Sequence, residues 1–130
     1  MPSIATCCCG ALRALPSTPP LRVSMCHCHA CQRRTGSVFG VQARFEAGTV
    51  AFEGTDREYT RVGDAGSRIT FHFCPSCGST VWYTIDGMPD LVAIPVGAFA
   101  DNTLPAPEYS VYEDRMHPWV VLPEDIEHFA

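Results

Sequence analysis

The cysteines are the residues of this sequence whose type and spacing could do chemistry. The 130-residue chain contains eight of them, in three clusters. The clusters are Cys7-Cys8-Cys9, Cys26-His27-Cys28-His29-Ala30-Cys31 and Cys74-Pro75-Ser76-Cys77. Tetrahedral zinc takes four thiolate or imidazole ligands, which proteins usually supply as close pairs from distant segments. The spacing therefore predicts a protein that folds around zinc bound by its cysteines.

Cys74 and Cys77 form the most specific ligand pair. Two residues separate them, and Gly78 follows, which suits the positive φ that such turns often require. The pair that completes the site has two candidates, and zinc geometry alone does not choose between them. These candidates are Cys7 with Cys9, and Cys28 with Cys31.

The choice between these pairs decides what kind of second site remains. If the N-terminal pair completes the first site, three central cysteines are left, which with an open fourth position is the pattern of catalytic zinc. These three are Cys26, Cys28 and Cys31, with Cys8 spare. If the central pair completes it instead, four cysteines close a second site of structural character. These four are Cys7, Cys8, Cys9 and Cys26.

Disulfides and histidine ligands are weaker alternatives to these two sites. The N-terminus shows neither the basic region nor the apolar run of a signal peptide, so we expect a cytoplasmic chain, in which structural disulfides are rare. Thiolates already satisfy the coordination number, so we expect His27 and His29 to support the site rather than to bind the metal. No role is assigned to His72, His117 or His128.

Composition limits the partners and the fold class. Nine basic against 14 acidic residues give a net charge of -5, the wrong sign for binding nucleic acid. The longest apolar stretches, such as residues 91–96, are too short to span a membrane. The length fits one domain over residues 1–130, and 11 Pro with 10 Gly favour turns and short strands over long helices. The oligomeric state is not indicated.

Short strands must position the cysteines. Residues 68–73 alternate between apolar and polar side chains, and residues 81–85 are β-branched and aromatic, so they predict a hairpin that carries the Cys74 and Cys77 turn. Further strands are expected at residues 12–15, 21–25, 38–45, 49–52, 57–61 and 91–96, in one or two antiparallel sheets. Helical turns are expected at residues 30–35, ending at Gly36, and at residues 124–129.

With these motifs in place, the sequence resembles the glutathione-dependent formaldehyde-activating enzyme family, also called the CENP-V/GFA domain family. The resemblance runs from about Thr6 to Trp119 and agrees in motif order and spacing. Gln32 stands where the family pattern suggests a basic residue. The matching motifs are Cys7-Cys8-Cys9-Gly10, Cys26-His27-Cys28-His29-Ala30-Cys31-Gln32-Arg33-Arg34-Thr35-Gly36-Ser37 and Phe73-Cys74-Pro75-Ser76-Cys77-Gly78-Ser79.

The resemblance implies a mainly β, Mss4-like fold with two zinc sites, and it resolves the open pairing. It implies a structural zinc shared by the first and last motifs, here Cys7, Cys9, Cys74 and Cys77. It implies a second zinc with an open position in the central motif, here the catalytic group Cys26, Cys28 and Cys31. The implied activity is that of a carbon–sulfur lyase of the S-hydroxymethylglutathione synthase type.

The charge of the central site indicates how it would act. A zinc ion with three thiolates carries about -1, which makes it a poor activator of water but leaves it able to accept the thiol of glutathione or a similar small molecule. Arg33 and Arg34 follow the motif and are candidates to bind the carboxylates of that substrate, and His27 or His29 could shuttle a proton. The competing hypotheses are a zinc-stabilised binding module without catalysis and, last, a redox sensor that uses Cys8.

Overall fold

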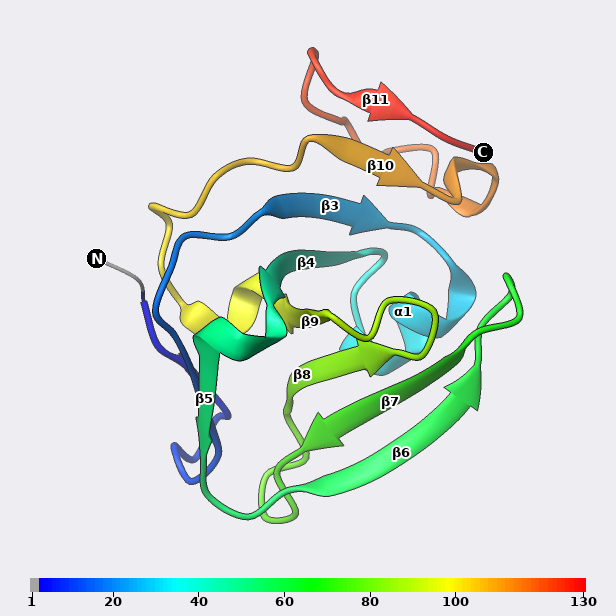
Figure 1. Cartoon of the computed structure of the whole chain (residues 1–130). Helices are drawn as coiled ribbons and strands as arrows, with labels where there is room; N and C mark the ends of the chain where they lie inside the picture. The colour runs from blue at the N-terminus through cyan, green and yellow to red at the C-terminus, as the bar shows by residue number, and fades with distance from the viewer. Residues whose placement is uncertain (1–2) are drawn as a thin grey trace.

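Two β-sheets and one short α-helix make up residues 3–130, the part of the chain that the computed structural model describes (Figure 1). In chain order the elements are β1 (Ala5–Thr6), β2 (Arg13–Pro16), β3 (Arg22–Cys26), α1 (His29–Thr35), β4 (Gly40–Glu46), η1 (Ala47–Thr49), β5 (Val50–Glu53), β6 (Arg57–Val62), β7 (Arg68–Phe73), β8 (Thr80–Ile85), β9 (Leu91–Pro95), η2 (Val96–Phe99), β10 (Tyr109–Val111), η3 (Glu113–Arg115) and β11 (Glu127–His128). The η segments are single 3₁₀ turns. The predicted mainly β fold with short helical turns is confirmed.

The larger sheet has eight strands in the order β11-β10-β3-β4-β9-β8-β7-β6, and the smaller has three in the order β1-β2-β5. In Figure 1 the larger sheet curves strongly, so that the β6–β7 hairpin and the β3–β10 pair lie on opposite sides of a shared concave face. Most neighbours are antiparallel, but β10 runs parallel to both β3 and β11. The sheet is therefore mixed rather than purely antiparallel.

The two faces of the larger sheet differ in polarity because side chains alternate along each strand. Val23 of β3, Ala43 of β4 and Ile94 of β9 are cross-strand partners, and all three are buried in the main hydrophobic core. Their neighbours Ser24 and Gln42, also paired across the strands, point to the opposite, concave face and line a cavity there. The convex face of the larger sheet thus packs into the hydrophobic core, while its concave face lines a cavity that could hold a ligand.

The hydrophobic core lies between the convex face of the larger sheet and the smaller sheet. Its largest fully buried side chains are Phe45 and Ile94 from the larger sheet and Leu12 from the loop after β1, and Ala5 and Ala14 of the smaller sheet pack in the same cluster. Phe99 of η2 closes one side, with its ring centroid 6.1 Å from that of Phe45. Cys7 and Cys74 belong to the same cluster of buried residues, so one cysteine site sits at the edge of this core.

The expected elements differ from the structure mainly near the C-terminus. The eight predicted strands correspond to β2 through β9, with ends shifted by up to two residues, and the turn at residues 30–35 is α1. The predicted helical turn at residues 124–129 is wrong, because the backbone there pairs with β10. The N–H of Glu127 donates to the carbonyl of Glu108 (3.1 Å), and that of Phe129 donates to Ser110 (2.9 Å). Across residues 3–130, no helix has the length and hydrophobicity that crossing a membrane requires.

Ile94→Ala tests the position of the core. Ile94 is fully buried on the central strand β9, so we expect its truncation to lower the free energy of unfolding by about 2–5 kcal/mol, the usual cost of a cavity in a packed core. Val62→Ala is the control: Val62 is 61% exposed on the edge strand β6, and the change should stay within about 0.5 kcal/mol. Urea denaturation of the metal-loaded protein measures both, and equal effects would contradict this assignment of the core.

Candidate metal centre and active-site cavity

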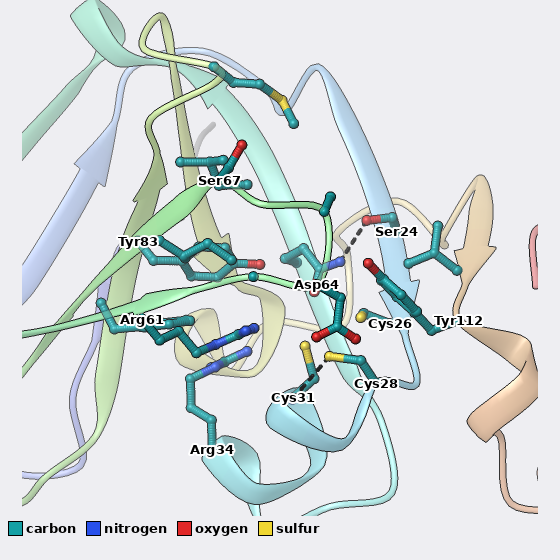
Figure 2. Close-up of a pocket in the computed structure, with 18 of the residues that line it drawn as sticks. Ser24, Cys26, Cys28, Cys31, Arg34, Arg61, Asp64, Ser67, Tyr83 and Tyr112 are labelled. Carbon is teal, nitrogen blue, oxygen red and sulfur yellow. Dashed lines mark hydrogen bonds between the residues drawn. The ribbon is translucent and has the colours of Figure 1, made fainter.

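Three cysteines converge where β3 passes into α1. Cys26 ends the strand, Cys28 caps the helix and Cys31 lies in its first turn. All three are buried, their sulfur atoms lie within 4.8 Å of one another, and Figure 2 shows the sulfurs turned toward a common point. Among the described residues, no fourth His, Cys, Asp or Glu side chain joins this group of possible metal ligands. Three sulfurs at this spacing could bind a metal ion, one ligand short of a tetrahedron.

Backbone hydrogen bonds fix this arrangement. The Cys28 sulfur accepts a hydrogen bond from the N–H of Cys31 (3.3 Å), as an N-cap side chain does, and the Cys28 carbonyl accepts from the N–H of Gln32 (3.0 Å). The helix ends after two turns at Gly36, whose φ of 72° lies in the left-handed region that glycine adopts without strain. The motif therefore needs a short helix with a defined end.

Crowding of the three thiols separates their pKa values. Hydrogen bonds from Cys26 and then from Cys31 lower the pKa of Cys28 to about 2, whereas the hydrogen bonds with Cys28 and Cys31 raise the pKa of Cys26. Without a cation, the trio therefore holds one thiolate that its two neighbours stabilise as thiols. With a divalent cation bound, all three sulfurs can be thiolates, because each of them then forms a bond to the metal. This donor set fits zinc.

A cavity of about 230 Å³ opens directly above the three cysteines. The curved sheet surrounds it, since its walls come from strands β3, β4, β6, β7, β8 and β10 and from the turn between β6 and β7. Figure 2 shows the cysteines at one end, with Arg34, Arg61, Tyr83 and Tyr112 directed into the same space. A small molecule in this cavity could reach the sulfurs.

Three arginines line this cavity: Arg34 from α1, Arg44 from β4 and Arg61 from β6. The guanidinium carbon of Arg34 lies 5.3 Å from the ring centroids of both Phe71 and Tyr83, and that of Arg61 lies 5.7 Å from Phe71. These aromatic faces hold the side chains in place by cation–π contact. The cysteine centre therefore faces a positively charged wall.

Two tyrosines complete the cavity wall. Burial raises the pKa of Tyr83, so its hydroxyl stays protonated and is available as a hydrogen-bond donor. Tyr112 packs against the cysteine trio and has a φ of 56°, a left-handed conformation that costs a non-glycine residue free energy. The turn after β10 is thus held in an unfavourable backbone state that directs an aromatic ring to the cavity.

The residues between and after the cysteines support the trio from outside. His27 is fully buried, its Nε2 lies 2.9 Å from Ser110 Oγ on β10, and burial lowers its pKa. The Gln32 side chain donates to the His27 carbonyl (2.9 Å) and lies 2.9 Å from His117 Nε2. His29 is exposed, and neither His27 nor His29 lines the cavity or joins the sulfur group. The structure therefore offers no contact for the suggested proton shuttle.

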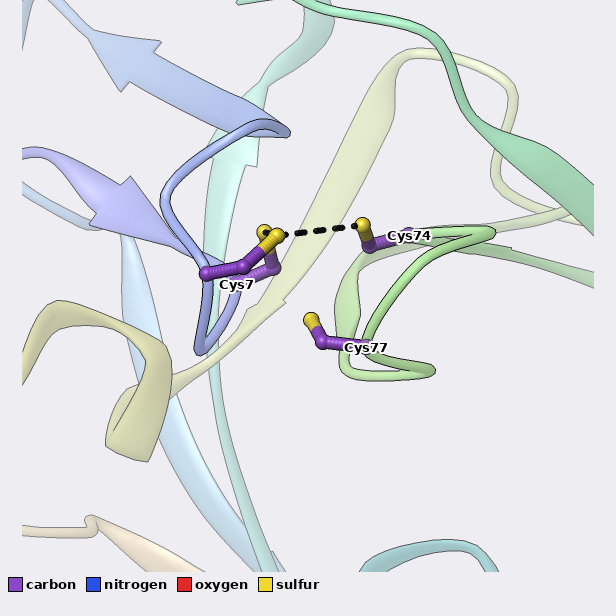
Figure 3. Close-up of side chains that lie close together, drawn as sticks. Cys7, Cys74 and Cys77 are labelled. Atoms are coloured by element: carbon purple, nitrogen blue, oxygen red, sulfur yellow. Dashed lines mark hydrogen bonds between the residues drawn. The ribbon is translucent and has the colours of Figure 1, made fainter.

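A second group joins the loop after β1 to the turn between β7 and β8. It consists of Cys7, Cys9, Cys74 and Cys77, whose sulfurs all lie within 4.8 Å (Figure 3). The Cys9 sulfur lies 3.6 Å from those of both Cys7 and Cys74. Sulfurs bound to zinc at about 2.3 Å in a tetrahedron are about 3.8 Å apart. The measured separations fit that geometry, so this group could hold a metal with four protein ligands.

The turns around this second group favour thiolates. Backbone N–H groups donate to sulfur from Leu12 to Cys7 (3.2 Å) and from Ser76 to Cys74 (3.4 Å). Hydrogen bonds from the backbone and then the side chain of Ser79 lower the pKa of Cys77 to about 5. Gly78 follows with a φ of 80° and donates its N–H to the Cys74 carbonyl (2.8 Å). The positive φ that the sequence pattern suggested is present.

The structure separates the other candidate residues. Arg34 borders the cysteine cavity, whereas the exposed Arg33 lines a neighbouring hollow. Cys8 lies outside both groups, is exposed, and accepts a hydrogen bond from the Ser79 hydroxyl (3.2 Å). His72, to which the sequence assigned no role, has its Nδ1 2.6 Å from an Asp56 carboxylate oxygen and its ring stacked on that of Trp82.

Sequence reasoning missed most of the cavity wall: Gln42, Arg44, Arg61, Tyr83 and Tyr112. A signal existed in β4, where the polar residues Gln42 and Arg44 alternate with the apolar Ala43 and Phe45. Alternation marks two faces but does not say that one of them lines a cavity. The sequence pattern alone gave no such signal for Tyr112.

The comparisons with known proteins agree with this geometry. The sequence model of the glutathione-dependent formaldehyde-activating enzyme family matches residues 3–115, which include both cysteine groups. The chain belongs to this family. No curated protein sequence matches the chain with significant similarity.

A solved structure shares the fold of this family member. It is the crystal structure of a Rhodobacter sphaeroides protein determined as a structural-genomics target, with a TM-score of 0.59 and 15% sequence identity. The match covers 98% of this chain and 99% of that chain. At this identity the likeness concerns the fold alone, and it extends over the whole described structure.

Cys77→Ser tests whether the four-cysteine group holds the two sheets together through a metal. We expect the variant to lose one metal equivalent and to unfold at a lower temperature, because metal binding at such a site contributes directly to folding. The matched control is Cys8→Ser, which lies beside this group but outside it and should keep both properties. Elemental analysis and thermal unfolding measure the outcome; an unchanged metal content in Cys77→Ser would contradict the assignment.

Proposed function

We propose that the protein is a zinc-dependent carbon–sulfur lyase that acts on an adduct of glutathione or a similar small thiol, as an S-hydroxymethylglutathione synthase does. One observation carries the proposal: three cysteine sulfurs, rather than four ligands, meet at the end of a cavity large enough for part of a small molecule. Family membership supports it, since the family is described as a formaldehyde-activating enzyme that depends on glutathione. A purely structural site would have no need for this access.

Zinc at this centre would accept the substrate thiol as its fourth ligand and lower the pKa of that thiol, so that it reacts as a thiolate. Cys26, Cys28 and Cys31 hold the metal in this proposal, while Cys7, Cys9, Cys74 and Cys77 hold the structural zinc. The net charge of about -1 on three thiolates and a divalent ion disfavours activation of water, which separates this activity from hydrolysis.

The reaction needs a group that stabilises charge on oxygen. As the thiolate sulfur forms its bond to the carbonyl carbon, the carbonyl electron pair moves to the oxygen, which takes up a proton to become a hydroxyl; the reverse step breaks the C–S bond. Tyr83 supports this chemistry, because its buried hydroxyl stays protonated on the cavity wall and can donate to that oxygen. Arg34, on the same wall, stabilises the negative charge of the thiolate centre.

Cys28→Ser tests the catalytic metal. Cys28 caps α1 and contributes one of three sulfurs, so we expect the variant to retain the fold but to bind one metal equivalent fewer and to lose lyase activity. Serine still caps the helix, which separates loss of metal from loss of structure. Metal analysis, circular dichroism and the rate of formation of S-hydroxymethylglutathione are the measurements, with Cys8→Ser as the control that keeps activity.

Cobalt substitution distinguishes the enzyme from a non-catalytic binding module. A centre that accepts an outside thiol should show a thiolate-to-cobalt charge-transfer band that grows when glutathione is added, and this growth should be absent in Cys28→Ser. A spectrum that does not respond to glutathione in the wild-type protein would favour the binding module and count against the lyase.

A further inference from the structure

The arginines of the cavity lack the carboxylate partners that arginines usually find. The chain carries a net charge of -5, yet Arg34, Arg44 and Arg61 gather around one cavity. Within residues 3–130, the ion pairs of arginine are made by Arg13 and Arg115, and none joins the cavity arginines to an acidic side chain. In an acidic protein, three unpaired guanidinium groups at one place mark a site for an anion.

The cysteine centre does not balance this charge. Three thiolates with a divalent metal ion carry about -1, against +3 from the guanidinium groups. Asp64 also lines the cavity, but its carboxylate accepts a hydrogen bond from Arg115, which neutralises it. A thiolate substrate would add one more negative charge and still leave the wall positive. The excess calls for at least one further anionic group on the ligand.

Buried polar atoms at the cavity point to the same conclusion. The Nε–H donors of Arg34 and Arg44 are buried and have no hydrogen-bond partner among the described residues. Leaving such atoms unpaired costs free energy, so folded proteins rarely do so without a reason. The guanidinium groups donate in a planar fork that matches the two oxygens of a carboxylate.

A neighbouring hollow extends the site beyond the cavity. Arg34, Arg61 and Phe71 belong to the walls of both the 230 Å³ cavity and a second hollow of about 620 Å³. The second hollow also includes Arg33 and Tyr59. The two spaces therefore adjoin each other at Arg34, Arg61 and Phe71, so a group bound in either one meets the same two guanidinium side chains.

We propose that Arg34, Arg44 and Arg61 bind a carboxylate of the substrate, so that the cavity selects acidic substrates over neutral ones. This inference rests on the proposed function, because it places the carboxylate on the molecule whose sulfur or carbonyl carbon reacts at the cysteine centre. The carboxylate has two possible sources, the thiol and the carbonyl compound. Formaldehyde has none, so in a reaction of formaldehyde the thiol must supply it.

Calorimetric titration of the zinc-loaded protein tests the thiol as the source without measuring activity. The probe is N-acetyl-S-methylglutathione, which keeps both carboxylates but has neither a free thiol nor a charged amine, and its neutral counterpart is the dimethyl ester. We expect the ester to bind about tenfold more weakly or worse, the value of one charge-assisted hydrogen bond. Glyoxylate against acetaldehyde is the second arm, for a carboxylate on the carbonyl compound.

Variants locate the binding group. Arg44→Gln and Arg61→Gln should each weaken binding of the preferred acid about tenfold while leaving the neutral compound unaffected. Arg57→Gln is the matched control, because Arg57 is exposed on the same strand as Arg61 and lines neither hollow. Should a variant fail to fold by circular dichroism, the comparison of acid and ester on the wild type still decides.

The outcomes separate this inference from the proposed function. Acid-selective binding that depends on the arginines supports the inference even if glutathione leaves the cobalt spectrum unchanged, which would overturn only the lyase. A cobalt spectrum that responds to glutathione, together with equal binding of acid and neutral compounds in both arms, overturns the inference and leaves the lyase in place.

Discussion

Mutual repulsion among crowded sulfur atoms is the constraint on which this structure depends. Seven of the eight cysteines lie in two groups with sulfurs within 4.8 Å of one another, and thiolates at that distance repel. Hydrogen bonds relieve part of this repulsion, as at Cys28 and Cys77, whose pKa values fall while that of Cys26 rises. A divalent cation relieves the rest and turns the same crowding into a cross-link.

The two groups use this cross-link differently because of their positions in the fold. Cys7 and Cys74 are part of the hydrophobic core, and the turns that carry them come from different sheets. A metal there would join segments 65 or more residues apart and would supply stability that a small core lacks. The trio at Cys26 to Cys31 closes only a local loop between β3 and α1, so a metal there would contribute less to stability and would face a cavity instead.

The cysteine motifs and the strands around them were predictable, because both depend on local sequence. Spacing defined the ligand pairs, and alternation at residues 68–73 defined β7 to the residue. The pairing of Cys7 and Cys9 with the last motif was not derivable from spacing; the family resemblance supplied it, and the structure brings these cysteines together. The helical turn expected at residues 124–129 failed because a short polar segment has no strong preference, and pairing with β10 decided its conformation.

The cavity wall was the least predictable part, since it is assembled from residues that are distant in sequence. Arg44, Tyr83 and Phe71 are neighbours only through the register of β4, β9, β8 and β7, in which Arg44 pairs with Ala93, Ala93 with Tyr83, and Tyr83 with Phe71. A shift of one residue in any pairing would turn these side chains to the other face. Their placement is a property of the whole sheet.

The cysteine trio and the cavity wall depend on different parts of the sequence. The cysteine spacing is local, since Cys26, Cys28 and Cys31 lie within six residues of one another and bring their sulfurs together between β3 and α1. The wall includes residues outside the motifs, such as Arg44 and Tyr112. Tyr112 keeps a left-handed conformation that is unfavourable for a tyrosine, so something must hold it there. The N–H of the next residue, Glu113, donates to the carbonyl of Phe129 (3.0 Å), and the Tyr112 carbonyl accepts from the N–H of Arg115 (3.0 Å), so the C-terminal segment and the turn that follows help to hold this conformation. In the proposed function, the C-terminal segment would therefore act on substrate selection through Tyr112.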